Sequence, residues 1–112
     1  MSDCIFCRIV AGESPAEVVA SDARFLAFKD RHPLAPVHVL IAPRRHVASL
    51  SDLGEVGGDG VALFDFIATL AADLGVSDSG YRVVTNTGPD AGQKVMHLHW
   101  HLIGGAPLGG MA

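Results

Sequence analysis

The segment from His97 to Leu102 constrains this chain more than any other, and it reads His-Leu-His-Trp-His-Leu. Histidine alternates with a large apolar residue, and a period of two is typical of a strand whose successive side chains point to opposite faces. We therefore predict a strand that places His97, His99 and His101 in a row on one face, roughly 6.5–7 Å apart. The apolar residues between them would face a core.

Three imidazoles on one face are poor core material, because each ring carries two nitrogens that need hydrogen-bond partners away from water. A lone histidine in a strand is most often structural. Three on one face, followed by Gly104 and Gly105, favour a functional role instead.

Length and composition predict a single domain spanning residues 1–112, with a loosely ordered Gly-rich tail over residues 104–112. The chain is 49% hydrophobic and 18% charged, which excludes disorder, and its apolar runs are too short to span a bilayer. A net charge of −4 gives no general attraction for nucleic acid. Two cysteines and no recognisable export signal favour the reducing cytoplasm, with neither nucleic acid nor membrane as a partner.

Hydrophobic periodicity and turn residues predict the remaining elements. We expect a short helix from Cys4 to about Ala11, then a hairpin of strands 18–20 and 24–28, and a buried strand over 38–42. We also expect a turn at 51–53 and a mobile Gly57-Gly58 pair. The last expected elements are a helix from Asp59 or Gly60 to Leu74 with Asp59 as its N-cap, a strand over 81–87 and a loop over 87–93.

The histidine row supports two kinds of chemistry. Neutral imidazole is a good nucleophile near pH 7, and the central His99 is the best placed to attack phosphorus, beside a Gly-rich loop from Gly88 to Lys94 that could bind a phosphate. Alternatively, His97, His99 and His101 could hold a metal-activated water. Consecutive same-face residues of one strand are nearly collinear, so at most two of the three could bind one ion.

Cys4 and Cys7 form a Cys-x2-Cys pair that could supply two thiolates to a structural zinc ion. Tetrahedral zinc then needs two further ligands, and His46 and His97 are the candidates. The alternative is a pair of reduced cysteines that pack as small apolar residues.

The order His97-Leu98-His99-Trp100-His101-Leu102 resembles the His-φ-His-φ-His-φ pattern of the histidine triad superfamily, in which φ is apolar. Further segments fall in the same order as in its nucleotide-binding, Hint-like branch of bacterial type. These are Cys4-Ile5-Phe6-Cys7, Phe28-Lys29-Asp30, Ala35-Pro36-Val37-His38, Pro43-Arg44-Arg45-His46, Tyr81-Arg82-Val83-Val84-Thr85-Asn86 and Gly92-Gln93.

The resemblance implies an α+β fold with a five-stranded antiparallel sheet, one long and one short helix, and a homodimer with a continuous ten-stranded sheet. It also implies a nucleotidyl hydrolase or transferase that cleaves purine nucleoside 5′-phosphoramidates through a covalent nucleotidyl-histidine. The matching catalytic residues are His99 as nucleophile, His101, His97 and His38. The matching substrate-binding residues are Asp30, Phe28, Asn86, Gly92 and Gln93, and the matching zinc ligands are Cys4, Cys7, His46 and His97, one ion per chain.

Two departures bear on the substrate. Lys94 stands where the branch commonly has serine or threonine, so we expect it to contact the substrate near the leaving group. The C-terminal segment lacks the tryptophan of animal members. No acidic cluster suits magnesium, so no obligatory Mg²⁺ is expected. Hydrolysis of dinucleoside polyphosphates and a non-catalytic purine-nucleotide-binding dimer remain as alternatives.

Overall fold

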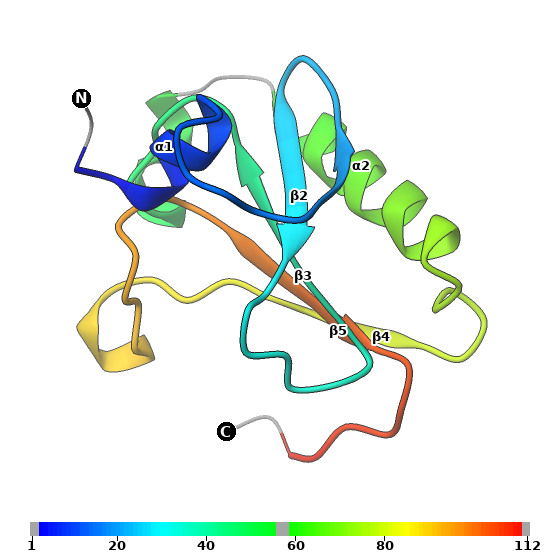
Figure 1. Cartoon of the computed structure of the whole chain (residues 1–112). Helices are drawn as coiled ribbons and strands as arrows, with labels where there is room; N and C mark the ends of the chain where they lie inside the picture. The colour runs from blue at the N-terminus through cyan, green and yellow to red at the C-terminus, as the bar shows by residue number, and fades with distance from the viewer. Residues whose placement is uncertain (1–2, 56–58, 111–112) are drawn as a thin grey trace.

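A computed structural model describes residues 3–55 and 59–110 of the chain, with the elements labelled in Figure 1. The expected Gly57-Gly58 pair lies outside the described residues. In chain order the elements are α1 (Ile5–Val10), β1 (Val18–Ser21), β2 (Phe25–Lys29), β3 (Val37–Pro43), the 3-10 helix η1 (Leu50–Glu55), α2 (Asp59–Asp73), β4 (Tyr81–Val84), the 3-10 helix η2 (Pro89–Ala91) and β5 (Trp100–Gly104).

The five strands form one antiparallel sheet in the order β1-β2-β3-β5-β4. From β3 the chain passes through η1 and α2 to the edge strand β4, and it then returns to insert β5 between β3 and β4. The histidine-bearing β5 is therefore an interior strand with a ladder on both sides. The predicted α+β fold with a five-stranded antiparallel sheet and two helices is confirmed.

Helix α2 covers one face of the sheet. Its inward side chains repeat at helical spacing, and they pack against alternate residues of the strands. This main core contains Leu63, Ile67, Leu70 and Ala71 of α2 with Phe25, Ala27, Val39, Ile41, Leu98, Trp100 and Leu102. The expected burial of the apolar residues between the histidines is confirmed.

Helix α1 lies over the opposite face, as Figure 1 shows, and it builds a second and smaller core. Phe6 packs there against Leu26, Phe28, Leu40 and Ala42, which alternate along β2 and β3 with the residues of the main core. Because α1 is short, it leaves part of this face uncovered. His101 of β5 and the rings of His97 and His99 just before it lie on this side, so the face that α2 leaves open can hold a site.

The histidine strand begins later than its alternation suggests, because β5 starts at Trp100. Leu98 N–H donates to Val47 O at 2.6 Å, outside the ladder, so His97 and His99 precede the strand. Apolar alternation predicts which side chains are buried, but it does not predict which backbone groups form the hydrogen bonds of the sheet. The strand also continues through Gly104, which the sequence assigned to the tail.

Two other boundaries differ from the sequence prediction. Strand β4 ends at Val84, three residues before the predicted end, and the Thr85 hydroxyl donates to His99 O at 2.7 Å. Helix α2 already includes Asp59, which was expected to precede it as the N-cap.

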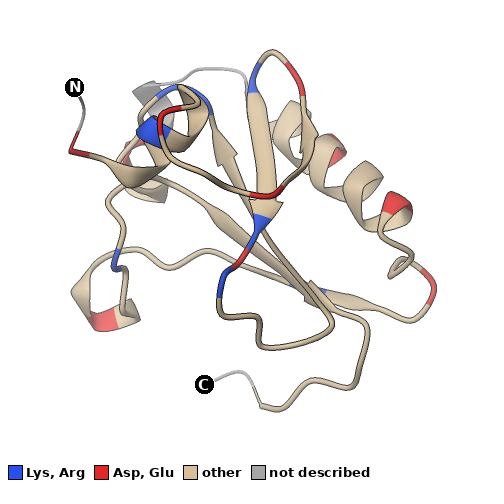
Figure 2. Ribbon diagram, viewed as in Figure 1, with Lys and Arg blue, Asp and Glu red and all other residues tan. Residues whose placement is uncertain are grey.

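Charged residues of both signs are interspersed over the turns and helices, whereas the central strands carry few (Figure 2). Among the described residues, no helix is both long and apolar enough to cross a membrane.

Candidate active site and metal site

Three histidine rings line up along the segment that leads into β5. The ring centroids of His99 and His101 are 5.3 Å apart. The Phe6 ring forms T-shaped contacts with the rings of His97 and His99, at centroid distances of 5.8 and 4.9 Å. The rings therefore share one side of the chain, as the alternation predicts. His97 is fully buried, whereas His99 and His101 are partly exposed.

Hydrogen bonds fix which nitrogen of His99 is free. Its Nδ1 lies 2.7 Å from the carbonyl oxygen of His97, which can only accept, so Nδ1 carries the proton and donates it. In the neutral ring, Nε2 then holds an unshared lone pair. The Thr85 bond to His99 O holds the backbone in place at the same residue. His99 thus presents a nucleophilic nitrogen in a fixed orientation.

A second chain of hydrogen bonds fixes His101. The backbone N–H of Leu34 donates to His38 Nδ1 at 3.0 Å, so neutral His38 carries its proton on Nε2. The His38 Nε2–H donates to His101 Nδ1 at 2.9 Å. Asp30 Oδ2 lies 3.4 Å from His38 Nε2. His101 must then carry its own proton on Nε2. The site therefore holds one imidazole with a free lone pair beside one with a free N–H donor.

Asp30, His38 and His101 are also close enough to hold a cation. A metal on His38 Nε2 would displace the proton from that nitrogen, while Nδ1 already accepts from Leu34. The ring would then have to be an imidazolate. The hydrogen bonds therefore favour a hydrogen-bonded chain of neutral rings over a metal ion at these three residues.

Burial keeps these imidazoles neutral. Desolvation, with smaller contributions from the nearby His99 and His38, lowers the pKa of His101 to about 4, against the opposing effect of the Asp30 carboxylate. Desolvation also lowers the pKa of His38, and the Asp30 carboxylate opposes that shift. At pH 7 both rings are neutral, which is the state that the tautomer assignments require.

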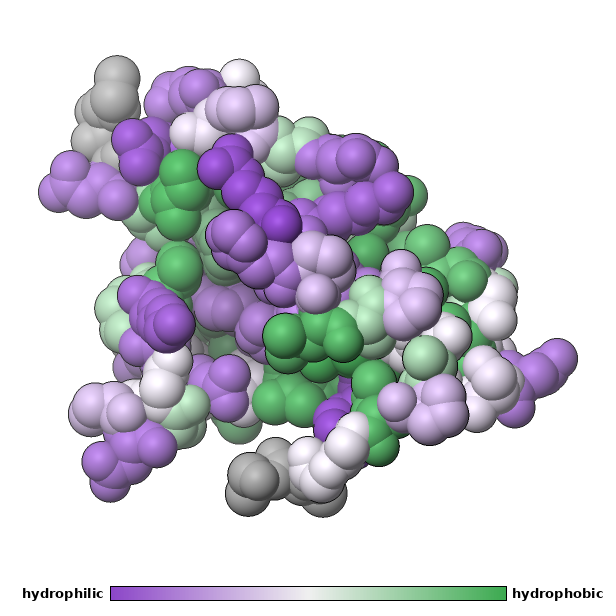
Figure 3. Space-filling model, turned by 60° about the horizontal axis from the view of Figure 1, so that its bottom comes forward, coloured by the Kyte–Doolittle hydropathy of each residue, from purple (hydrophilic) through white to green (hydrophobic). Residues whose placement is uncertain are grey.

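A pocket of about 730 Å³ opens over these rings, on the face that α2 leaves uncovered. The surface turned forward in Figure 3 is hollowed, with hydrophilic side chains in the depression beside apolar ones. Both His99 and His101 line the pocket. All the residues that the resemblance assigned to substrate binding line it too: Phe28, Asp30, Asn86, Gly92, Gln93 and also Lys94. The structure thus brings together every predicted substrate-site residue.

The loop before the histidines is braced by Gln93. Its side-chain oxygen accepts from Gly88 N–H at 2.9 Å, and its NH₂ group donates to Ala48 O and Val95 O at 2.8 and 3.1 Å. Gly92 sits at φ 77°, a left-handed conformation that favours glycine. The amide of Gln93 therefore holds the loop, although the sequence pointed to a direct contact with substrate.

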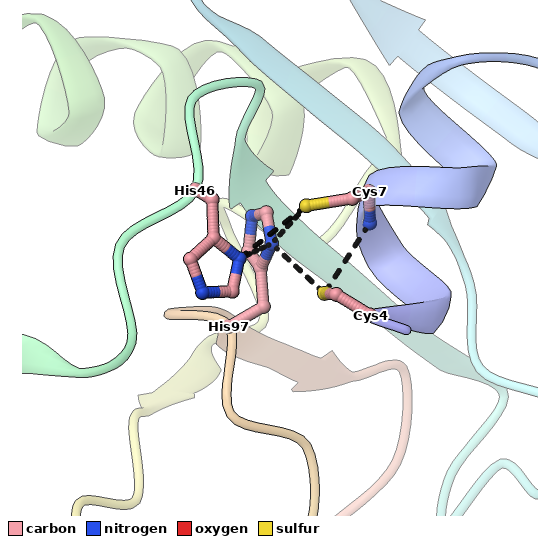
Figure 4. Close-up of side chains that lie close together, drawn as sticks. All are labelled: Cys4, Cys7, His46 and His97. Atoms are coloured by element: carbon pink, nitrogen blue, oxygen red, sulfur yellow. Dashed lines mark hydrogen bonds between the residues drawn. The ribbon is translucent and has the colours of Figure 1, made fainter. Parts of the chain in front are cut away.

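His97 belongs to a separate cluster with Cys4, Cys7 and His46, which Figure 4 shows between α1 and the chain after β3. His97 Nδ1 lies 3.3 and 3.5 Å from the sulfurs of Cys4 and Cys7, and His46 Nδ1 lies 3.3 Å from both Cys7 Sγ and His97 Nδ1. Tetrahedral zinc with Zn–S near 2.3 Å and Zn–N near 2.0 Å would place two nitrogens about 3.3 Å apart and a nitrogen and a sulfur about 3.5 Å apart. The spacing fits.

The tautomer of His97 also fits a metal ligand. Its Nε2 lies 2.8 Å from the carbonyl oxygen of Pro43 and donates to it, so Nδ1 directs its lone pair toward the cysteines. Burial lowers the pKa of His97, which favours the neutral form that binds metals. All four predicted ligands converge, and the cluster could hold a metal ion.

Sequence reasoning missed the groups that orient the rings. The backbone N–H of Leu34 and the carbonyl oxygens of Pro43 and His97 set the three tautomers. Almost every residue type offers the same backbone groups, so the sequence does not mark these positions. Phe6 was identified only as part of a Cys-x2-Cys segment. Its place between the two cysteines on a short helix could have indicated packing beside the metal ligands.

Comparison with known proteins identifies the family. The HIT domain family matches residues 11–108. This chain belongs to the HIT family. The match includes β5 and the loop from Gly88 to Lys94, while the Cys4 and Cys7 pair lies before it.

Relatives agree over nearly the full length. A HIT-like protein of Chlamydia pneumoniae is 43% identical, and the alignment covers 96% of this chain and 98% of the relative. The purine nucleoside phosphoramidase of Escherichia coli K12 is 36% identical, with 97% and 92% covered. A HIT family hydrolase from Clostridium thermocellum superposes with a TM-score of 0.92 at 40% identity, covering 99% and 97% of the two chains. These likenesses support a hydrolase of the HIT family.

Proposed function

We propose that this HIT protein hydrolyses purine nucleoside 5′-phosphoramidates through a nucleotidyl-histidine on His99. The observation that carries the proposal is the tautomer pair: His99 offers the lone pair of Nε2 next to the Nε2–H of His101, at the floor of one pocket. The Escherichia coli relative named as a purine nucleoside phosphoramidase supports this class of substrate.

In the first step, His99 Nε2 attacks the α-phosphorus, an Nε2–P bond forms and the P–N bond to the amine breaks. The amine leaves with the electron pair of that bond and takes up a proton from solvent in the open pocket. His101 Nε2–H would donate a hydrogen bond to a non-bridging oxygen, stabilising charge as it develops. His38 holds His101 in the required tautomer, and Asp30 holds His38.

In the second step, water attacks the same phosphorus and the Nε2–P bond breaks. The bond electrons return to His99 Nε2, and the nucleoside 5′-monophosphate is released. The attacking water gives up one proton to solvent, which balances the proton that the amine took up in the first step. His99 recovers its starting tautomer, because its Nδ1–H remains bonded to His97 O throughout.

The nucleoside end belongs at the apolar part of the pocket, where Phe28 offers a face for the purine and Asp30 an acceptor for the ribose hydroxyls. Asn86 and the loop at Gly92 would contact the phosphate end. Lys94 lies one residue beyond Gln93 and would face the leaving group.

We also propose that the cluster of Cys4, Cys7, His46 and His97 binds one structural zinc per chain. Two thiolates and two neutral imidazoles match the donor set of structural zinc sites. When bound, zinc would join α1 to the segment before β5 and so fix Phe6 against the His99 ring. Reduced cysteines of this kind suit a cytoplasmic protein.

We further propose a homodimer in which two β4 edges join into a ten-stranded sheet. Strand β4 is an edge, and it exposes the apolar side chains of Tyr81 and Val83. The other edge, β1, carries a bulge near Val18 and begins beside the ion pair of Lys29 with Glu17, and both features disfavour strand pairing.

Steady-state kinetics test the function. We expect kcat/KM for adenosine 5′-phosphoramidate to exceed that for diadenosine triphosphate at least tenfold. The reverse order would favour a dinucleoside polyphosphate hydrolase. His99→Ala should abolish turnover while nucleotide binding and the melting temperature are retained. Nucleotide binding without turnover of either substrate by the native protein would support the non-catalytic binding dimer instead.

A further inference from the structure

A second hollow of about 480 Å³ adjoins the pocket. Ile5, Lys94 and Val95 line both cavities, so the two meet at Lys94. Asp3 and Met96, which is 51% exposed, line only the second hollow, together with Cys4 and His46 of the metal cluster. The shared wall makes Lys94 the boundary between the two spaces.

Lys94 stands out among the charges around the pocket. Lys29 is paired with Glu17 at 2.7 Å, and the Arg31 guanidinium contacts Pro15 O at 3.4 Å. Within residues 3–55 and 59–110, no ion pair or hydrogen bond engages the Lys94 ammonium. His38 and His101 are neutral at pH 7, because burial lowers the pKa of each. Lys94 therefore offers an unengaged positive charge at this end of the pocket.

We propose that the second hollow is the leaving-group subsite and that Lys94 selects leaving groups with an anion next to the scissile bond. This inference rests on the proposed function. With the nucleoside against Phe28 and Asp30 and the α-phosphorus at His99, the other substituent of phosphorus must leave by the part of the pocket that the nucleoside does not fill. The adjoining space is the second hollow.

The lining of the hollow indicates the chemistry of that substituent. Asp3 lines the second hollow but not the first, whereas Lys94 lines both. An anion is therefore favoured where the cavities meet and disfavoured farther in. Ile5 and Val95 add apolar surface at the shared wall, and Met96 adds it in the second hollow alone. An α-amino acid bound to phosphorus through its amine fits: its carboxylate lies next to the bond, and an apolar side chain can enter the hollow. A β-phosphate offers the same adjacent anion.

Two matched substrates test the inference: the adenosine 5′-phosphoramidates of phenylalanine and of phenethylamine, which differ only in the α-carboxylate. We expect the native protein to favour the phenylalanine derivative about fivefold in kcat/KM, the upper range for an exposed charge pair. In Lys94→Met the ratio should fall about fivefold from its native value. Comparing the ratio between native protein and variant removes the difference in intrinsic reactivity of the two P–N bonds.

Lys29→Met is the matched control, because Lys29 is the other lysine of the chain and lies at the nucleoside end. Both substrates carry the same nucleoside, so Lys29→Met should leave their ratio unchanged. Diadenosine triphosphate, whose leaving group is ADP, separates the two sources of the anion. A larger loss for this substrate than for the phenylalanine derivative in Lys94→Met would assign the subsite to a phosphate and exclude the carboxylate.

A ratio that does not change in Lys94→Met, or one that changes equally in Lys29→Met, would overturn the inference while leaving phosphoramidate hydrolysis intact. If the native protein cleaves neither phosphoramidate, the proposed function itself fails, and the inference fails with it.

Discussion

At the scale of single residues, the protonation of the site is set by burial and by backbone groups. His101 loses its affinity for protons because it is partly buried among other imidazoles, and Leu34 N–H decides which nitrogen of His38 can donate. One ring is left as a nucleophile and the next as a donor, without a charged residue in contact with either free nitrogen in the described part of the chain.

The lowered pKa of His101 predicts that stability depends on pH. Its pKa is about 4 in the folded protein and about 6.5 when unfolded, so the unfolded chain binds more protons between these values. Stability therefore decreases as pH falls from about 6.5 toward 4, and at pH 5 the loss should be about 2 kcal/mol. Urea unfolding at pH 7 and pH 5 measures it. His101→Asn should show a correspondingly smaller loss, and an equal loss in both proteins would contradict the assignment.

The sequence predicted which residues would carry the chemistry, but not their protonation. Alternation alone put His97, His99 and His101 on one side, and family resemblance separated their roles. The structure then divided them, because His97 turns toward the cysteines and away from the pocket. The deciding contacts come from backbone atoms of distant segments, and no pattern of side chains records these.

At the scale of elements, the apolar pattern located the helices and strands, because α2 is buried on one side and the central strands β2 and β3 are buried along nearly their whole length. It placed strand ends poorly. The alternation before β5 extends back to His97, where the side chains are already buried. There the Leu98 N–H bonds to Val47 O, and the backbone is not yet part of the sheet. Strand β4 ends early for a related reason, since the Thr85 side chain bonds to His99 O.

The loop that ends at Gly92 offers a test of how backbone conformation supports the site. Gly92→Ala should destabilise the protein by about 1 kcal/mol, because φ is 77° there and an L residue is strained in that region. A Cβ at Gly92 would meet no atom within 4 Å, so the effect comes from the backbone alone. Gly109→Ala, in equally open space without a positive φ, is the control. Equal melting temperatures for the two variants would contradict this account.

At the scale of the whole molecule, the proposed zinc site joins segments that are far apart in the sequence. We expect about one zinc per chain by elemental analysis, and its loss in a Cys4→Ser, Cys7→Ser double variant. The melting temperature should fall as well, because metal binding contributes to folding. His32→Ser, which changes an exposed histidine outside the cluster, should retain the metal. Zinc retained by the double variant would place the ion elsewhere.

The proposed dimer predicts that the two sheet edges respond differently. Val83→Asp puts a charge on the apolar edge β4, so it should shift the protein toward monomer in sedimentation experiments. Val18→Asp makes the same change on edge β1, where 49% of Val18 is exposed, and should leave the mass unchanged. Dissociation by Val18→Asp alone would move the interface to the opposite edge.

The account depends most on His99 acting as the nucleophile. Rapid mixing with an adenosine 5′-phosphoramidate, followed by denaturation at neutral or alkaline pH and mass spectrometry, measures it directly. We predict an added adenylyl group on the peptide that contains His99, lost on treatment with acid and absent in His99→Ala. Substrate turnover by His99→Ala at the native rate, or an adenylyl group on another residue, would contradict the central claim.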